Sequence, residues 1–360
     1  MVDGFATTLA LSPGQRLLQL HHAGLATRVA DERQRWQQVC DRFFARLENR
    51  VIERVLLRRI RRAFDHLENR EHLEAILLAL RSEYVNGRAG TLAMAAKPAV
   101  ELVSVDSSPT HAAWLCGTPS YNQLLIYTAG GGFLLPPSAS QLNCARRLGE
   151  LCDTDTVINQ HAMAPEAPFP AGIDDTVALC QWGIERYGAQ NVVLAADTAG
   201  ASITLGALQR LREQGSSMPV ALQLFSPWND LSLSGWSYIT KSATADSPFR
   251  METAAFCARA YLGDVPTTEP LASAIFADLK GLPPLAVHTS RFDMHFDDAL
   301  RMIENMRQSG GHGEIRYWDS PRHHLERFNS KEAEKSLGMA SAFLRRHLGV
   351  RDVSGMGRGD

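Results

Sequence analysis

Three side chains in the second half of the chain have the types and the order that acyl transfer requires. Thr198 supplies a hydroxyl within Ala-Asp-Thr-Ala-Gly, and Asp293 and His323 follow it along the sequence. Acyl transfer needs a nucleophile, a base that takes its proton and an acid that orients the base. We therefore assign Thr198 as the candidate nucleophile, Asp293 as the acid and His323 as the base.

The segment around Thr198 predicts a strand, a tight turn and a helix. Residues 192–195 form a short apolar run typical of a buried strand, and residues 201–212 are rich in Ala and Leu. Small residues flank Thr198, as a turn that strains its central residue requires. The pattern resembles the nucleophile elbow of the α/β-hydrolases, in which the central residue is Ser. Thr retains the hydroxyl, but its added methyl group restricts the rotamers and crowds the oxygen.

A run of glycines is the candidate for stabilising the charge that develops during acyl transfer. Gly130, Gly131 and Gly132 directly follow an apolar run at residues 124–127. Glycines present backbone N–H groups without obstruction by Cβ. We expect the N–H groups of Gly131, Gly132 and Ala199 to form an oxyanion hole. Each signal is weak alone, and the prediction depends on their joint occurrence at the carboxyl ends of predicted strands.

Strands and helices alternate from residue 99 onward. Expected strands cover residues 100–105, 112–116, 124–127, 156–160, 192–195, 220–225, 285–289 and 314–318. Expected helices cover residues 139–152, 174–187, 201–212, 297–308 and 331–347. This alternation predicts an α/β fold with a doubly wound, mostly parallel sheet.

The beginning of the chain has a different composition. Residues 1–90 are rich in Leu, Arg and Glu, with apolar residues at helical spacing, and we expect a helical N-terminal region or cap. The basic amphipathic segment 54–64 is interpreted as a surface helix packed on a core, with membrane or partner docking as the alternative. We expect residues 91–350 to form the catalytic domain and the Gly-rich residues 351–360 a disordered tail.

The stretch from residue 99 to 347 resembles the hormone-sensitive-lipase family of α/β-hydrolases, which includes plant carboxylesterase-like proteins. The elbow at Thr198 and the acid loop from Asp293 to Asp297 and Asp298 match that family in order. Further matching motifs are Gly-Gly-Gly-Phe at 130–133, Ala-Pro-Glu-Ala-Pro-Phe-Pro-Ala at 164–171, Ser-Pro-Trp-Asn-Asp-Leu-Ser at 226–232 and Leu-Pro-Pro at 282–284. The resemblance implies an α/β-hydrolase fold with a helical cap built partly from the N-terminus.

The departures from the family pattern occur at the residues that are expected to carry out the reaction. Thr198 replaces Ser, Ala196 and Ala201 replace glycines, and Ala129 replaces the His that precedes the glycines. The candidate acid and base are retained, which an eroded active site does not typically show. The activity that the resemblance implies is hydrolysis of a small-molecule ester, or acyl transfer, through a Thr-His-Asp triad.

Two other interpretations assign a different function to the same site. Plant isoflavanone dehydratases resemble this chain in having Thr at the elbow, which favours a lyase or cyclase that avoids acylation and polarises a carbonyl. Plant gibberellin receptors of the family bind a ligand without turnover, which is the third interpretation. Whether Thr198 becomes acylated distinguishes the first interpretation from the others.

Several other side chains near predicted strand ends have alternative roles. His324 is the alternative base to His323. Asp197 is expected to brace the elbow. Hydrogen-bonded packing is expected of His161, His288 and His295. Substrate binding, or packing in the core, is expected of Phe133, Leu134 and Trp228.

Composition excludes several partners. The formal charge of −2 and the lack of a nucleic-acid-binding motif argue against a nucleic-acid partner. Six scattered cysteines predict buried thiols and no zinc site, and the glycine run lacks the spacing of a nucleotide-binding loop. We expect a cytoplasmic enzyme without a membrane span, metal or cofactor. The oligomeric state stays open, with a homodimer among the alternatives.

Overall fold

The computed structural model describes residues 102–104, 112–115, 121–241 and 251–348. The expected helical region at 1–90, its basic segment at 54–64 and the expected tail at 351–360 lie outside the described residues.

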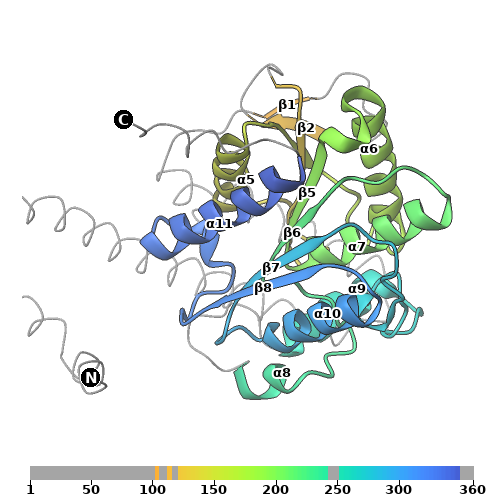
Figure 1. Ribbon diagram of the computed structural model, residues 1–360. Coiled ribbons are helices and arrows are strands. Elements are labelled where there is room, and N and C mark those ends of the chain that lie inside the picture. Colours follow the sequence, from red (N-terminus) through yellow and green to blue (C-terminus); the bar gives the residue numbers. More distant parts are fainter. Residues whose placement is uncertain (1–101, 105–111, 116–120, 242–250, 349–360) are drawn as a thin grey trace, which may run out of the picture. The chain divides into compact units, whose positions relative to one another are not determined.

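The fold is built on an 8-stranded sheet with the order β1-β2-β4-β3-β5-β6-β7-β8 (Figure 1). The strands from β4 to β8 in this order run parallel, and β1 and β2 are antiparallel additions at one edge. Their bounds are β1 Leu102–Ser104, β2 Ala112–Leu115, β3 Leu124–Thr128, β4 Asp155–Asn159, β5 Val192–Asp197, β6 Leu222–Phe225, β7 Leu285–Ser290 and β8 Gly313–Trp318. The predicted doubly wound, mostly parallel sheet is confirmed.

Helices cover both faces of the sheet (Figure 1). On one face, α5 (Ala139–Cys152) packs beside α11 (Lys331–His347). On the other face lie α6 (Ala171–Tyr187), α7 (Ala199–Glu213) and α10 (Phe296–Gln308). Between β6 and β7 the chain forms α8 (Trp236–Lys241) and α9 (Met251–Leu262), two helices that the sequence pattern did not predict.

The central strands are buried on both sides, which explains why they appear in the sequence as continuous apolar runs. In β3, Leu124 and Ile126 join the core under α6 and α7, whereas Leu125 and Tyr127 join the core under α5 and α11. A parallel sheet between two helical layers requires this arrangement, because each strand must fill two cores.

The parallel register places the carboxyl ends of the strands at one edge of the sheet. Asp197 at the end of β5 pairs with Phe225 at the end of β6, and Ser290 at the end of β7 pairs with Trp318 at the end of β8. The loops that follow β3, β5, β7 and β8 therefore leave the sheet on the same side. Open α/β sheets bind their ligands outside this edge.

The first turn of α7 lies against the end of β3, and Gly200 makes this contact. A Cβ on Gly200 would lie 2.2 Å from the carbonyl oxygen and 2.9 Å from the carbonyl carbon of Thr128. These atoms belong to backbone, so a side chain at this position would force the helix and the strand apart. The absence of a Cβ at Gly200 is what allows the helix to start directly after Thr198.

We expect Gly200→Ala to lower the free energy of unfolding by about 1–3 kcal/mol, because the added methyl overpacks a rigid backbone contact. Gly338→Ala in α11 is the matched control, since a Cβ there meets nothing within 4 Å. This control substitution is expected to stabilise the protein by up to about 1 kcal/mol. Urea unfolding of the three proteins measures both effects, and equal stabilities would contradict this account of the helix start.

Candidate active site

Thr198 has a backbone conformation that is rare for a β-branched residue, with φ 49° and ψ −118°. The surrounding structure holds this conformation through two hydrogen bonds. The Thr198 N–H donates to the carbonyl of Phe225 at 3.1 Å, and its carbonyl accepts from the N–H of Trp228 at 3.0 Å. Strain of this kind costs about 1–3 kcal/mol, and it occurs mainly at functional sites.

The structure brings Thr198, His323 and Asp293 into one hydrogen-bonded line. His323 Nε2 lies 2.9 Å from Thr198 Oγ1, and His323 Nδ1 lies 2.8 Å from Asp293 Oδ2. An Nδ1–H that donates to the carboxylate leaves Nε2 as the acceptor for the threonine proton. All three side chains are buried. The geometry is that of a nucleophile, its base and an orienting acid.

Asp293 stays ionised in this site. Burial alone would raise its pKa, but the facing His323 and hydrogen bonds from His295 and His323 outweigh burial and hold the pKa well below the usual range. A carboxylate at Asp293 fixes the orientation of the His323 ring and stabilises the imidazolium that forms when His323 takes a proton.

The glycine loop after β3 lies directly against the elbow. A Cβ on Gly130 would come within 2.7 Å of Thr198 Cβ and 2.8 Å of Asp197 Oδ2. The carbonyl of Gly131 accepts from the N–H groups of Leu134 and Leu135, so the N–H of Gly132 in the same peptide plane points the opposite way. The oxyanion-hole role of Gly131, Gly132 and Ala199 stays a prediction, and Ala199 begins α7, where backbone N–H groups are free of intrahelical partners.

Asp197, the residue before Thr198, is the centre of a buried hydrogen-bond network. Its carboxylate accepts from the Tyr127 hydroxyl at 2.9 Å and from Gln141 Nε2 at 2.9 Å. It also lies 3.2 Å from Thr198 Oγ1. Burial would raise its pKa, but His324 and the hydrogen bonds lower it, so Asp197 is also a carboxylate. These contacts are those of a brace for the elbow.

His324 faces Asp197 and the core, while its neighbour His323 faces Thr198. His324 Nδ1 lies 3.4 Å from Asp197 Oδ2, and its ring stacks on Phe225 with a centroid separation of 5.6 Å. Its backbone N–H donates to Ser226 Oγ at 3.0 Å. This geometry favours His323 over His324 as the base.

The remaining histidines divide into two kinds. His161 Nδ1 lies 2.9 Å from the Ala162 carbonyl and His288 Nδ1 lies 2.8 Å from Ser336 Oγ, which is the hydrogen-bonded packing that the sequence predicted. His295 differs, because its Nδ1 lies 3.2 Å from Asp293 Oδ1. Asp293 is therefore flanked by two imidazoles, and this role of His295 was missed.

The expected substrate-binding residues lie in the core. Phe133, Leu134 and Trp228 are only 2–3% exposed. The Phe133 ring stacks on Tyr261 of α9 with a centroid separation of 4.0 Å and an interplanar angle of 3°. Tyr261, which the sequence did not single out, thus joins α9 to the residue after the glycine loop. Substrate binding by the three expected residues stays a prediction.

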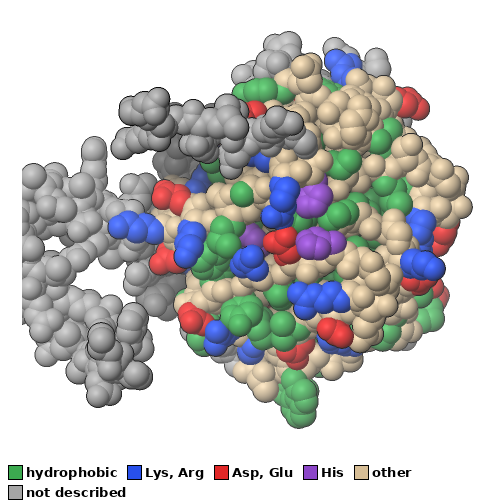
Figure 2. All heavy atoms as spheres, viewed as in Figure 1, with side chains coloured by type: hydrophobic (Ala, Val, Ile, Leu, Met, Phe, Trp, Pro, Cys, Tyr) green, Lys and Arg blue, Asp and Glu red, His purple; other side chains and the backbone are tan. Residues whose placement is uncertain are grey.

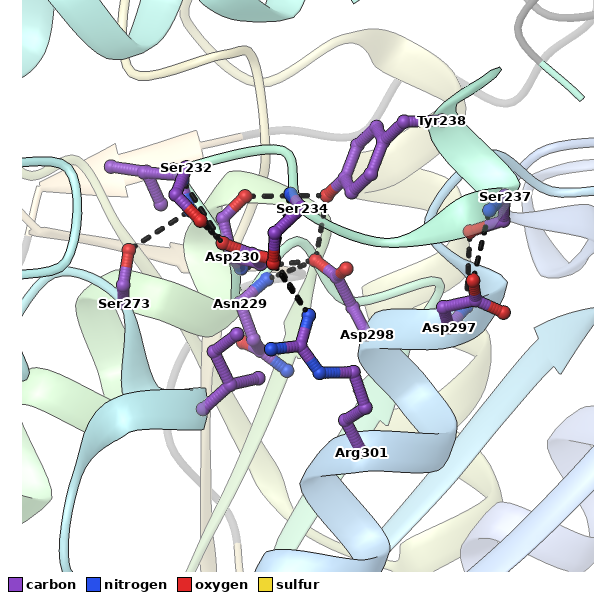
Figure 3. Close-up of polar contacts among 12 residues, drawn as sticks. Asn229, Asp230, Ser232, Ser234, Ser237, Tyr238, Ser273, Asp297, Asp298 and Arg301 are labelled. Carbon is purple, nitrogen blue, oxygen red and sulfur yellow. Dashed lines mark hydrogen bonds and ion pairs between the residues drawn. The ribbon is translucent and has the colours of Figure 1, made fainter. Parts of the chain in front are cut away.

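The Ser-Pro-Trp-Asn-Asp-Leu-Ser stretch is tied to α10 by buried polar contacts (Figure 3). Asp298 Oδ2 accepts from the backbone N–H groups of Asn229 and Asp230, at 2.9 and 3.0 Å, and from the Tyr238 hydroxyl at 2.7 Å. Arg301 pairs with Asp230 at 2.8 Å. Because α10 follows Asp293, this cluster fixes the acid loop relative to the loop after β6.

Figure 2 shows Lys and Arg side chains interspersed with Asp and Glu side chains on the viewed face of the described residues. Among the helices that the structure describes, none combines the length and apolar character needed to cross a bilayer.

The chain is similar to known hydrolases. The protein family described as alpha/beta hydrolase fold matches residues 125–326. An acetyl-hydrolase of Streptomyces hygroscopicus is 30% identical over 243 residues, which cover 66% of this chain and 80% of that protein. An esterase of Acinetobacter venetianus is 27% identical, with 62% and 75% covered.

The fold is also similar to solved structures. The crystal structure of an esterase from the bacterial hormone-sensitive lipase family has a TM-score of 0.67 and 28% identity. The likeness covers 72% of this chain and 89% of that one.

We expect Asp293→Asn to lower kcat for p-nitrophenyl acetate hydrolysis by about 10⁴-fold, because the amide stabilises the wrong tautomer of the base. Asp297→Asn is the matched control in the first turn of α10, since Asp297 accepts a hydrogen bond from the Ser237 N–H, outside the line from Thr198 to Asp293. The control should retain kcat within about twofold. Equal losses in the two variants would contradict the assignment of Asp293 as the acid.

Proposed function

The chain belongs to the alpha/beta hydrolase fold family, and from this premise we propose that it hydrolyses small carboxylic esters, with acyl transfer to another acceptor as the related reaction. The observation that carries the proposal is the hydrogen-bonded line from Thr198 Oγ1 through His323 to Asp293, with separations of 2.9 and 2.8 Å. The similarity to an acetyl-hydrolase and to bacterial esterases supports it.

The proposed reaction has two halves. In the first, His323 Nε2 takes the proton of Thr198 as Oγ1 bonds to the ester carbonyl carbon, and the carbonyl electrons move to oxygen. The N–H groups of Gly131, Gly132 and Ala199 stabilise this oxyanion. Its collapse breaks the ester C–O bond, and the alcohol leaves with the proton from His323. In the second half, water repeats these steps and releases the acid.

Two features of the site slow acylation at Thr198, and only the second, the methyl group, distinguishes threonine from serine. Its Oγ1 lies between two acceptors, His323 Nε2 at 2.9 Å and Asp197 Oδ2 at 3.2 Å. A hydroxyl has one proton, so donation to Asp197 withdraws it from the base. The added methyl group limits the rotamers through which Oγ1 can reach a carbonyl carbon.

We expect Thr198→Ala to abolish hydrolysis of p-nitrophenyl acetate, since no hydroxyl remains to form the acyl-enzyme. Thr198→Ser should raise kcat by about tenfold, which corresponds to a barrier lower by about 1.4 kcal/mol. Steady-state kinetics of the wild type and the two variants measure both effects. Full activity of Thr198→Ala would contradict a threonine nucleophile and favour a reaction without an acyl-enzyme.

A further inference from the structure

The acid of the site lies within a cluster of three metal-ligand side chains. Asp293, His295 and His323 each offer one ligand atom, and these atoms lie within 4.8 Å of one another. All three side chains are buried. One carboxylate and two imidazoles form a donor set that zinc and related transition-metal ions bind.

We propose that Asp293, His295 and His323 form an inhibitory site for Zn²⁺ or a similar divalent transition-metal ion. The effect of the metal on turnover rests on the proposed function, whereas binding of the metal depends only on the three side chains. Binding of the metal ion at this site reversibly inactivates the enzyme.

The distances suit a metal that replaces the protons between these groups. His323 Nδ1 lies 2.8 Å from Asp293 Oδ2, and His295 Nδ1 lies 3.2 Å from Asp293 Oδ1. Bonds of about 2.0–2.1 Å in a tetrahedral zinc site place neighbouring ligand atoms roughly 3.3–3.4 Å apart. Each Nδ1 atom thus lies within a few tenths of an ångström of this spacing from an oxygen of Asp293, and the three ligand atoms all lie within 4.8 Å of one another.

His295 is suited to be a ligand because its second ring nitrogen has no other bond to lose. Among the described residues, His295 Nε2 is buried without a hydrogen-bond partner. When Nδ1 binds a metal, the ring proton moves to Nε2.

The same tautomer change at His323 explains the inhibition. A metal on His323 Nδ1 places the ring proton on Nε2, which faces Thr198 Oγ1 at 2.9 Å. A protonated Nε2 donates to the hydroxyl and cannot accept its proton. Asp293 is already a carboxylate, and each ring keeps one N–H, so the metal binds without net proton release. The site loses its base while each residue stays in place.

Binding is tested in the Thr198→Ala variant, which separates the metal site from the proposed nucleophile. We expect one Zn²⁺ per chain by calorimetry and a visible absorption band of tetrahedral Co²⁺. Introducing His295→Leu into the Thr198→Ala variant should weaken Zn²⁺ binding by about 100-fold. His295→Asn is a second variant, because its amide can still donate to Asp293 but is a poor zinc ligand. The control is His312→Leu, since His312 is an exposed histidine 3.1 Å from Glu314.

Inhibition is tested in the wild type with p-nitrophenyl acetate. Zn²⁺ should stop turnover, and a chelator should restore it fully. His295→Leu and His295→Asn should each need about 100-fold more Zn²⁺ for half-inhibition. Zinc binding that survives both His295 variants but is lost in His312→Leu would overturn the proposal. Cobalt binding in a protein without esterase activity would support the metal site and contradict only the proposed function.

Discussion

The left-handed backbone of Thr198 is the constraint on which the rest of the site depends. It turns the chain from β5 into α7 within one residue and leaves the side chain at the carboxyl edge of the sheet. Gly200 allows α7 to pack against the carbonyl of Thr128, and Gly130 allows the loop after β3 to pack against the Thr198 Cβ. Backbone packing around the elbow thus fixes the position of the Thr198 hydroxyl.

Two buried carboxylates, each beside a histidine, then define the surroundings of that hydroxyl. Asp293 orients His323 toward Thr198, whereas Asp197 faces His324 and also accepts from Thr198. The threonine hydroxyl therefore faces two acceptors, the proposed base His323 and the structural carboxylate Asp197. Both carboxylates keep their charge in the core because imidazoles and hydrogen-bond donors compensate the cost of burial. In the proposed mechanism, the reactivity of the Thr198 hydroxyl depends on the balance between the Asp293–His323 pair and the Asp197–His324 pair.

Much of this arrangement follows from the sequence, because periodicity and strand order identify a parallel sheet. Once the sheet is parallel, residues that follow β5, β7 and β8 must meet at one edge, which is why Thr198, Asp293 and His323 could be grouped in advance. The roles of His295 and Tyr261 could not be predicted from the sequence. His295 reaches Asp293 through the local turn after β7, and Tyr261 reaches Phe133 through the packing of α9, which no sequence period specifies.

Covalent labelling shows whether Thr198 is a nucleophile. The wild type and Thr198→Ala are incubated with a fluorophosphonate, and intact mass and peptide mapping then locate any adduct. We expect one phosphonyl group per chain, bonded to Thr198 Oγ1 and absent from Thr198→Ala. Labelling of Thr198→Ser without any labelling of the wild type would contradict a threonine nucleophile, and so would an adduct on another residue.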